Sequence, residues 1–105
     1  MRIIFDQGTP APLRRHLDCH VVDTAAERGW SDLDNGDLID SAERAGYDVL
    51  ITTDQNLRYQ QNLAGRRLAV DVLLSTAWPK VQLHVADIRT ALDQIGPGEL
   101  REVSI

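Results

Sequence analysis

Asp-Val-Leu-Ile-Thr-Thr-Asp, residues 48–54, is the stretch that decides the fold, because it holds the clearest strand of the chain and ends at Asp54. Its short apolar run is typical of a strand that is buried on both faces of a parallel sheet. A second run of this kind, Arg-Ile-Ile-Phe at residues 2–5, ends at Asp6. We expect these two strands to be neighbours in the centre of the sheet.

Helices and further strands are predicted on either side of these two runs. Helical segments are expected at residues 13–17, 24–28, 36–45, 57–64 and 79–95, and strands at 20–22, 68–74 and 103–105. This alternation favours an α/β fold with a parallel sheet. Asp71 interrupts the apolar run of residues 68–74, and the pattern leaves open whether it is paired in the core or lies near a bulge.

Length and composition indicate one globular domain. The chain has 105 residues, of which 43% are hydrophobic and 26% charged, and its single cysteine excludes an intramolecular disulfide. It has no apolar run of the roughly 18 residues that a membrane span needs. The apolar start is too short for a signal peptide, so we expect a cytoplasmic protein.

The net charge of −5 does not decide between functions. Sixteen acids stand against eleven Arg and Lys, a balance that argues against a general coat for nucleic acids. A metal-dependent nuclease, however, needs clustered carboxylates, and these lower the net charge by themselves. Ten of the eleven basic residues are arginine, which suits contacts to phosphate.

Asp6 and Asp54 are the first candidates for a functional site. The carboxyl ends of neighbouring parallel strands meet at one edge of a sheet, where such folds bind their ligands. Two carboxylates at that edge repel each other unless a cation lies between them, and oxygen ligands favour Mg²⁺ or Mn²⁺. Alternatively, both residues only end their strands, since Asp is common in turns.

The start of the helix at residues 36–45 should lie at the same edge of the sheet. It brings Asn35 and Asp37, with Asp34 beside them, toward Asp6 and Asp54. Asp37 is a candidate third acid. The alternative is that Asn and Asp at a helix start serve only as caps and as partners of the helix dipole.

A polar stretch follows Asp54 and could bind RNA. Arg58, Tyr59 and the amides after them offer a cation for phosphate and an aromatic ring for base stacking, and Arg66 and Arg67 extend the basic segment. The alternative is an ordinary polar surface helix.

Three segments together resemble a family of short PIN-like proteins: residues 3–10 (Ile-Ile-Phe-Asp-Gln-Gly-Thr-Pro), 35–38 (Asn-Gly-Asp-Leu) and 51–57 (Ile-Thr-Thr-Asp-Gln-Asn-Leu). Members of that family begin with a strand ending in Asp-Glu-Asn or a close variant, followed by Leu-Pro or Val-Pro. An acid-bearing helix and a strand ending in Thr-x-Asp-x-Asp-Phe come next. The resemblance covers roughly residues 1–75. It implies a single PIN-like domain over residues 1–105, with three α/β/α layers and a small, mostly parallel sheet.

The resemblance also implies an activity, because PIN domains are Mg²⁺- or Mn²⁺-dependent ribonucleases and many bacterial ones are toxins of toxin–antitoxin pairs. The catalytic and metal-binding acids would be Asp6, Asp37 and Asp54, supported by Asn35 and Asn56. The expected nucleic-acid contacts are Arg58, Tyr59 and Arg66. The expected partners are single-stranded or structured RNA, an antitoxin protein and a second copy of the chain in a homodimer, with no membrane.

The chain departs from the family pattern at three positions. Gln7, Asn35 and Asn56 are neutral where the family usually has an acid. A site with fewer acids binds a metal ion less strongly. The alternative function is therefore a catalytically silent PIN-like module that binds RNA or a protein partner.

Overall fold

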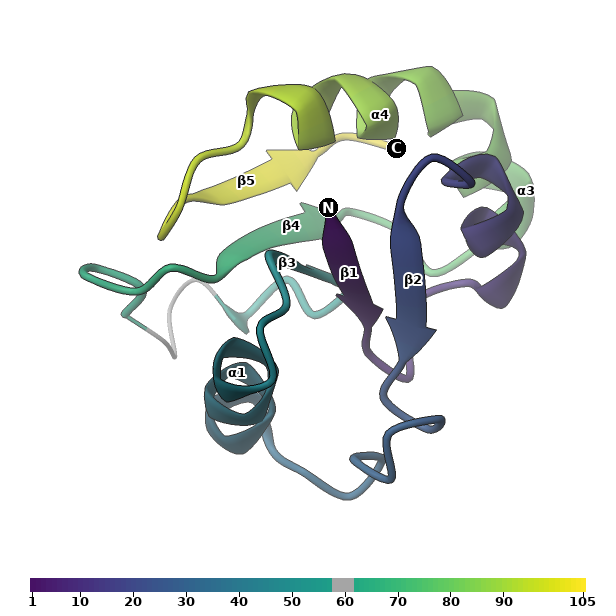
Figure 1. Ribbon diagram of the computed structural model, residues 1–105. Helices are drawn as coiled ribbons and strands as arrows, with labels where there is room; N and C mark the ends of the chain where they lie inside the picture. The colour runs from purple at the N-terminus through teal and green to yellow at the C-terminus, as the bar shows by residue number, and fades with distance from the viewer. Residues whose placement is uncertain (58–61) are drawn as a thin grey trace.

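A five-stranded, entirely parallel sheet forms the centre of the protein (Figure 1). The structure, a computed structural model, describes residues 1–57 and 62–105. The strands are arranged in the order β2–β1–β3–β4–β5. Their bounds are β1 Arg2–Phe5, β2 Val21–Thr24, β3 Val49–Thr52, β4 Ala69–Leu73 and β5 Leu100–Val103. The predicted pairing of β1 with β3 is confirmed, with Phe5 opposite Ile51.

Helices cover both faces of the sheet and complete three layers (Figure 1). One face carries α1 (Asn35–Arg44). The other face carries the 3₁₀ helix η1 (Ala11–His16), then α3 (Trp78–Val81), the 3₁₀ helix η2 (Gln82–His84) and α4 (Val85–Gln94). The α/β architecture predicted from the sequence is therefore confirmed. None of the helices in the described residues is long and apolar enough to cross a membrane.

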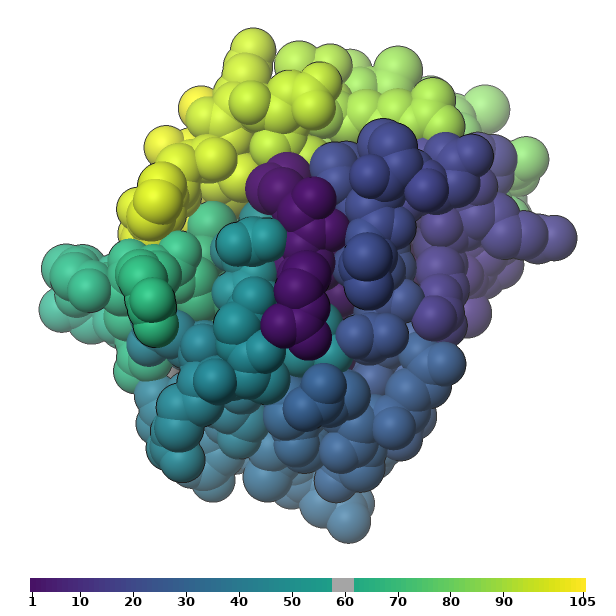
Figure 2. Space-filling view, in the orientation of Figure 1, coloured from purple at the N-terminus to yellow at the C-terminus, as the bar shows by residue number. Residues whose placement is uncertain are grey.

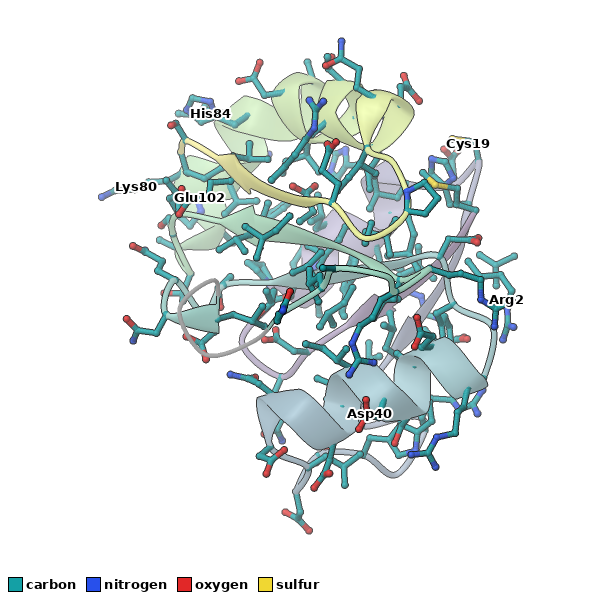
Figure 3. The ribbon with its side chains drawn as sticks, turned by 90° about the vertical axis from the view of Figure 1, so that its left-hand side faces the viewer. Arg2, Cys19, Asp40, Lys80, His84 and Glu102 are labelled. Carbon is teal, nitrogen blue, oxygen red and sulfur yellow. The ribbon has the colours of Figure 1, made fainter. Side chains whose placement is uncertain are left out.

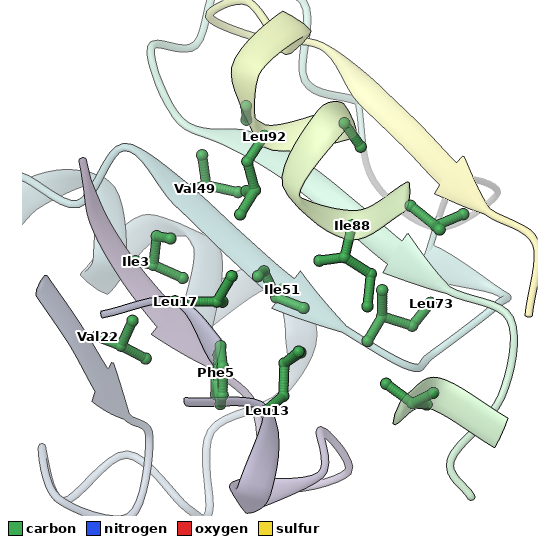
Figure 4. Close-up of a cluster of buried hydrophobic side chains, with 14 residues drawn as sticks. Ile3, Phe5, Leu13, Leu17, Val22, Val49, Ile51, Leu73, Ile88 and Leu92 are labelled. Carbon is green, nitrogen blue, oxygen red and sulfur yellow. The ribbon is translucent and has the colours of Figure 1, made fainter. Parts of the chain in front are cut away.

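Each face of the sheet has its own apolar core. Phe5 and Ile51 pack with Leu13 of η1 and Ile88 of α4 on one face (Figure 4). Side chains of alternate residues, such as Leu50, pack on the opposite face under α1. Burial on both faces explains why the central strands are apolar at nearly every position.

The winding of the chain reverses between β1 and β3. From β1 the chain passes through η1 to β2 on one side, and then returns under the sheet through α1 to β3 on the other side. The space-filling view shows the N-terminal strand enclosed between the β2 segment in blue and the segment leading into β3 in teal (Figure 2). In doubly wound sheets with this strand order, ligands bind at the carboxyl ends of β1 and β3.

The segment after β2 forms a turn where the sequence predicted a helix at residues 24–28. The backbone N–H of Glu27 donates to Thr24 Oγ1 at 3.1 Å, and the N–H of Thr24 donates to Glu27 Oε1 at 2.9 Å. This reciprocal pair is the pattern that caps a helix. Here Gly29, with φ of 74°, turns the chain away before a helix can continue.

Two predictions for the C-terminal part also need correction. The helix expected at residues 79–95 is divided into α3, η2 and α4, because the backbone of His84 (φ −117°, ψ 19°) leaves the helical region. The last strand starts at Leu100 and not at Val103, because the ladder to β4 begins with Val70 opposite Leu100. The helix expected at residues 57–64 lies in part outside the described residues.

Candidate functional site

Asp6 occupies the loop that leaves β1, with its carboxylate held by two threonines. Its backbone N–H continues the ladder by donating to the carbonyl of Ile51 at 3.2 Å. Asp6 Oδ1 accepts from the N–H of Thr9 at 3.1 Å, and the Thr9 hydroxyl lies 2.8 Å from both Asp6 Oδ1 and the carbonyl oxygen of Ile51, to either of which it can donate its one proton. Asp6 Oδ2 accepts from the hydroxyl of Thr52, the last residue of β3. The side chain is therefore fixed at the carboxyl edge of the sheet.

Asp54 is joined to Asp6 through the same Thr52. The N–H of Asp54 donates to Thr52 Oγ1 at 3.1 Å, while that hydroxyl donates its proton to Asp6. Asp54 Oδ2 accepts from Asn35 Nδ2 at 2.7 Å, and Oδ1 accepts from the N–H of Asn56 at 3.0 Å. Thr52 is fully buried, whereas both aspartates are partly exposed. The two acids thus share one buried hydroxyl and face solvent beside it.

Gly8 allows the loop of Asp6 to close onto β3. A Cβ atom at this position would lie 2.6 Å from Thr53 Oγ1 and 3.9 Å from Asp6 Oδ1. Any larger residue would push the loop away from Thr53, or displace the threonine. The absence of a side chain at position 8 is therefore part of the geometry that brings β1 and β3 residues together.

The start of α1 brings Asn35 to the site but leaves the Asp37 side chain exposed to solvent. Asn35 reaches Asp54. Asp34 caps the helix by accepting from the N–H of Asp37 at 2.8 Å, and the Asp37 side chain is exposed. No group of three or more His, Cys, Asp or Glu side chains in residues 1–57 and 62–105 is placed to hold a metal ion. Asp37 thus lies exposed in the first turn of α1, and its role as a third ligand beside Asp6 and Asp54 stays a prediction.

Arg66, the predicted RNA contact that falls within the described residues, does not lie at this site. Arg66 forms ion pairs with Asp40 at 2.7 Å and Glu43 at 3.2 Å. Both acids belong to α1, the helix on which Figure 3 labels Asp40. Hydrogen bonds from the N–H groups of Arg67 and Leu68 and the charge of Arg66 lower the pKa of Glu43. Arg66 is thus held near the start of β4, at the opposite edge of the sheet from Asp6. The RNA contact at Arg66 therefore stays a prediction, and it would lie away from Asp6.

The other two predicted contacts, Arg58 and Tyr59, lie outside the described residues. Asn56 is exposed, and the contact it makes with Asp54 comes from its backbone N–H. Its predicted role in orienting ligands or water stays a prediction.

A pocket of about 150 Å³ opens beside Asp6. It lies between the loop after β1 and the start of α1, and its wall includes Trp30 and Asn35. We call it the Asp6 pocket. A larger hollow of about 410 Å³ runs between α4 and β5, but none of the acids at the ends of β1 and β3 lines it. The Asp6 pocket therefore borders the candidate site.

Sequence reasoning missed Thr9, Thr52 and Trp30 as parts of the site. The signal for Thr52 was present, because the pairing of Phe5 with Ile51 puts the next residue of β3 beside Asp6. A hydroxyl at the end of a buried strand, next to a carboxylate on the neighbouring strand, is a natural hydrogen-bond donor. For Trp30, in a polar loop, the sequence carried no comparable signal.

Comparison of the chain with protein-family models, curated proteins and solved structures finds no match. The PIN-like family, the toxin role and the antitoxin partner therefore remain predictions from the sequence resemblance.

Proposed function

We propose that this protein is a PIN-like ribonuclease that depends on a divalent cation, with Asp6 and Asp54 as the residues that hold the cation. One observation carries the proposal: the Asp6 carboxylate and the backbone N–H of Asp54 both bond to the Thr52 hydroxyl, at the edge of the sheet where the winding reverses between β1 and β3. That position is where doubly wound sheets bind their ligands.

The chemistry of the donors supports Mg²⁺ or Mn²⁺. The groups at this edge of the sheet are carboxylate and hydroxyl oxygens, with the side-chain amide of Asn35 bonded to Asp54. Mg²⁺ is usually held by one or two protein carboxylates, while water and substrate phosphate supply the other ligands. Asp6 and Asp54 therefore suffice. When bound, such an ion polarises a phosphoryl oxygen and activates water for attack on phosphorus.

The protein's own contribution is to hold the two carboxylates in place and to leave lone-pair positions on them that can bind a cation. A carboxylate has about four lone-pair positions. Two or three protein hydrogen bonds end on the Asp6 carboxylate, depending on whether the Thr9 hydroxyl donates to it or to the Ile51 carbonyl, and two end on that of Asp54. Each group can therefore still accept a cation without losing the bonds that orient it. Side chains locked in this way need little reorganisation when substrate binds.

A second function, an RNA- or protein-binding module without catalysis, is favoured by Asn35. This residue places an amide N–H where the family has an acid, and the N–H takes up an oxygen of Asp54. The absence of a three-acid group in the described residues points the same way. Metal affinity would then be too low for turnover.

Cleavage of an end-labelled single-stranded RNA separates the two functions. The ribonuclease should cut it in Mn²⁺ or Mg²⁺ and leave it intact in excess chelator. Asp6→Asn and Asp54→Asn keep the size of each side chain and remove its charge, so each should reduce cutting by about a hundredfold or more and weaken Mn²⁺ binding in calorimetry.

Asp93→Asn is the matched control, because Asp93 is an exposed acid on α4. It should cut and bind Mn²⁺ like the parent. RNA that is bound but never cut, in both metals, would establish the silent module. Equal cutting by the parent and Asp54→Asn would exclude the proposed site.

A further inference from the structure

We infer that the Asp6 pocket binds one unpaired nucleobase of the RNA strand. The inference rests on the proposed function, because it names the part of the substrate that the protein would recognise next to the phosphodiester bond.

The size of the pocket fits one flat ring system. Its volume is about 150 Å³. Pockets for drug-sized ligands hold roughly 300–1,000 Å³, whereas one water molecule takes up about 30 Å³. The Asp6 pocket is therefore larger than a single-water site and smaller than a pocket that encloses a drug-sized ligand.

The lining matches the two chemical surfaces of a base. Apolar side chains form the smaller part of the wall, and because Ala25 and Leu38 are buried, contact with a ring face falls mainly to Trp30 and Leu33. Polar groups make up most of the wall, and Gln7 and Ser31 can bind the hydrogen-bonding edge, while Asp6 and Asn35 line the pocket on the side of the proposed cation. Proteins recognise unpaired RNA bases by this combination of aromatic or apolar packing and hydrogen bonds to the base edge.

Trp30, the aromatic part of the wall, is held in position by its neighbours. The Arg28 guanidinium lies 4.6 Å from the centre of the indole, and the Tyr47 ring meets it edge-on at 6.1 Å. Arg28 also donates to Tyr47 Oη at 3.1 Å, and Tyr47 donates to Asp23 Oδ2 at 2.5 Å. An indole fixed in this way loses little conformational freedom when a ligand packs against it.

Charge favours a base over an anionic ligand in this pocket. Asp6 lines it, and the exposed Asp32 and Asp34 lie on the loop that forms its outer wall. A free phosphate or other anion would be repelled by these carboxylates. A nucleobase is uncharged, and its N–H groups can donate to hydroxyl and amide oxygens.

Titration with the four ribonucleosides, followed by NMR, tests the inference without phosphate, metal or cleavage. The chain has two tryptophans, so two indole N–H signals are expected, and Trp78→Phe assigns them. At least one nucleoside should shift the Trp30 signal saturably and leave that of Trp78 unchanged. Ribose alone should move neither.

Ser31→Leu fills the pocket from its wall and should weaken nucleoside binding at least about fivefold, the lower end of the effect of a stacked base. Asp32→Leu, next to it on the same loop, is the control and should bind like the parent. An unchanged Trp78 signal shows that each variant is folded. Failure of all four nucleosides to move Trp30, or binding to a folded Ser31→Leu variant that equals the parent, would overturn the inference.

The outcomes of the cleavage and NMR experiments are independent. RNA cleavage without nucleoside binding would overturn the base pocket and leave the ribonuclease in place. Nucleoside binding at Trp30 without any RNA cleavage would support the pocket and count against the ribonuclease.

Discussion

Asp6 and Asp54, at the carboxyl ends of β1 and β3, differ from Asp71, in the middle of β4, in both exposure and partners. The first two are partly exposed, and each accepts hydrogen bonds from neighbouring residues. Asp71 is fully buried, and neither of its oxygens finds a donor within residues 1–57 and 62–105. One sheet thus holds carboxylates with partners and a carboxyl group without any.

The comparison shows which carboxyl groups have hydrogen-bond donors in the protein and which one does not. Burial raises the pKa of Asp71 from 3.8 to about 7, and the charge of Arg101 on β5 opposes this shift only in part. Asp71 is therefore easiest to hold as a neutral acid, whereas the strand-end acids have donors for a charged carboxylate. Open access and prepared donors favour a binding role for Asp6 and Asp54, and neither feature exists at Asp71.

The largest effect expected from this comparison is a loss of stability with rising pH, caused by Asp71. Between about pH 4 and 7 the native state keeps a proton on Asp71 that the unfolded chain has released. This contribution to the free energy of unfolding is complete below pH 4 and is lost by about pH 7. A shift of about three pKa units corresponds to roughly 4 kcal/mol.

Asp71→Asn isolates this effect, because the amide has nearly the same shape and stays neutral. In urea unfolding, the variant should match the parent near pH 4 and exceed its stability by several kcal/mol at pH 8. Asp93→Asn controls for a general change in net charge and should follow the parent at both values. Parallel pH profiles for the parent and Asp71→Asn would mean that Asp71 is ionised at little cost.

The next effect concerns the hydroxyl that joins the two strand-end acids. Thr52→Val keeps the shape of the buried side chain but removes the donor to Asp6 and the acceptor for the N–H of Asp54. We expect a loss of about 2 kcal/mol in the free energy of unfolding, because a hydrogen bond to a charged group is removed. Thr90→Val, at an exposed position of α4, should change stability by less than about 0.5 kcal/mol. Equal effects of the two substitutions would show that Thr52 does not hold the site together.

The sequence predicted the central part of the fold because that part depends on local patterns. Short apolar runs located β1 and β3, and parallel pairing then required Asp6 and Asp54 to meet at one edge. The role of Thr52 depends on the register between two strands. Thr52 and Asp6 are 46 residues apart in the sequence, so no local pattern contains their contact. Arg66 looked free to bind RNA, but its partners Asp40 and Glu43 come from α1. The segment after Thr24 has the hydrogen bonds of a helix cap, but it forms a turn and no helix follows it.

A smaller effect tests whether Asn35 limits metal binding at the strand ends. Asn35→Asp replaces the donor to Asp54 with a second negative charge, so without metal the variant should lose about 1 kcal/mol of stability. In Mn²⁺ the same carboxylate becomes an additional ligand, and the thermal midpoint should rise more than that of the parent. Asn62→Asp adds the same charge at an exposed position and should show no such Mn²⁺ response. If Mn²⁺ raises all three midpoints equally, Asn35 is not beside the ion.

The smallest expected effect concerns Arg101, which lies opposite Asp71 across the β4–β5 ladder. Its charge lowers the pKa of Asp71, so Arg101→Gln should raise that pKa above about 7. At pH 5 Asp71 is neutral and the substitution acts only through the contacts of Arg101 with Glu99 and Gln94. At pH 8 Asp71 is charged, and losing the Arg101 cation should lower the free energy of unfolding further. This additional loss should be less than about 0.5 kcal/mol, because the partly exposed guanidinium is screened by solvent. The test is the difference between the two pH values in urea unfolding, measured with Arg101→Gln alone and in the Asp71→Asn background. In that background the difference should vanish, since no charge remains at position 71; a difference that persists would assign the pH dependence to another group near Arg101.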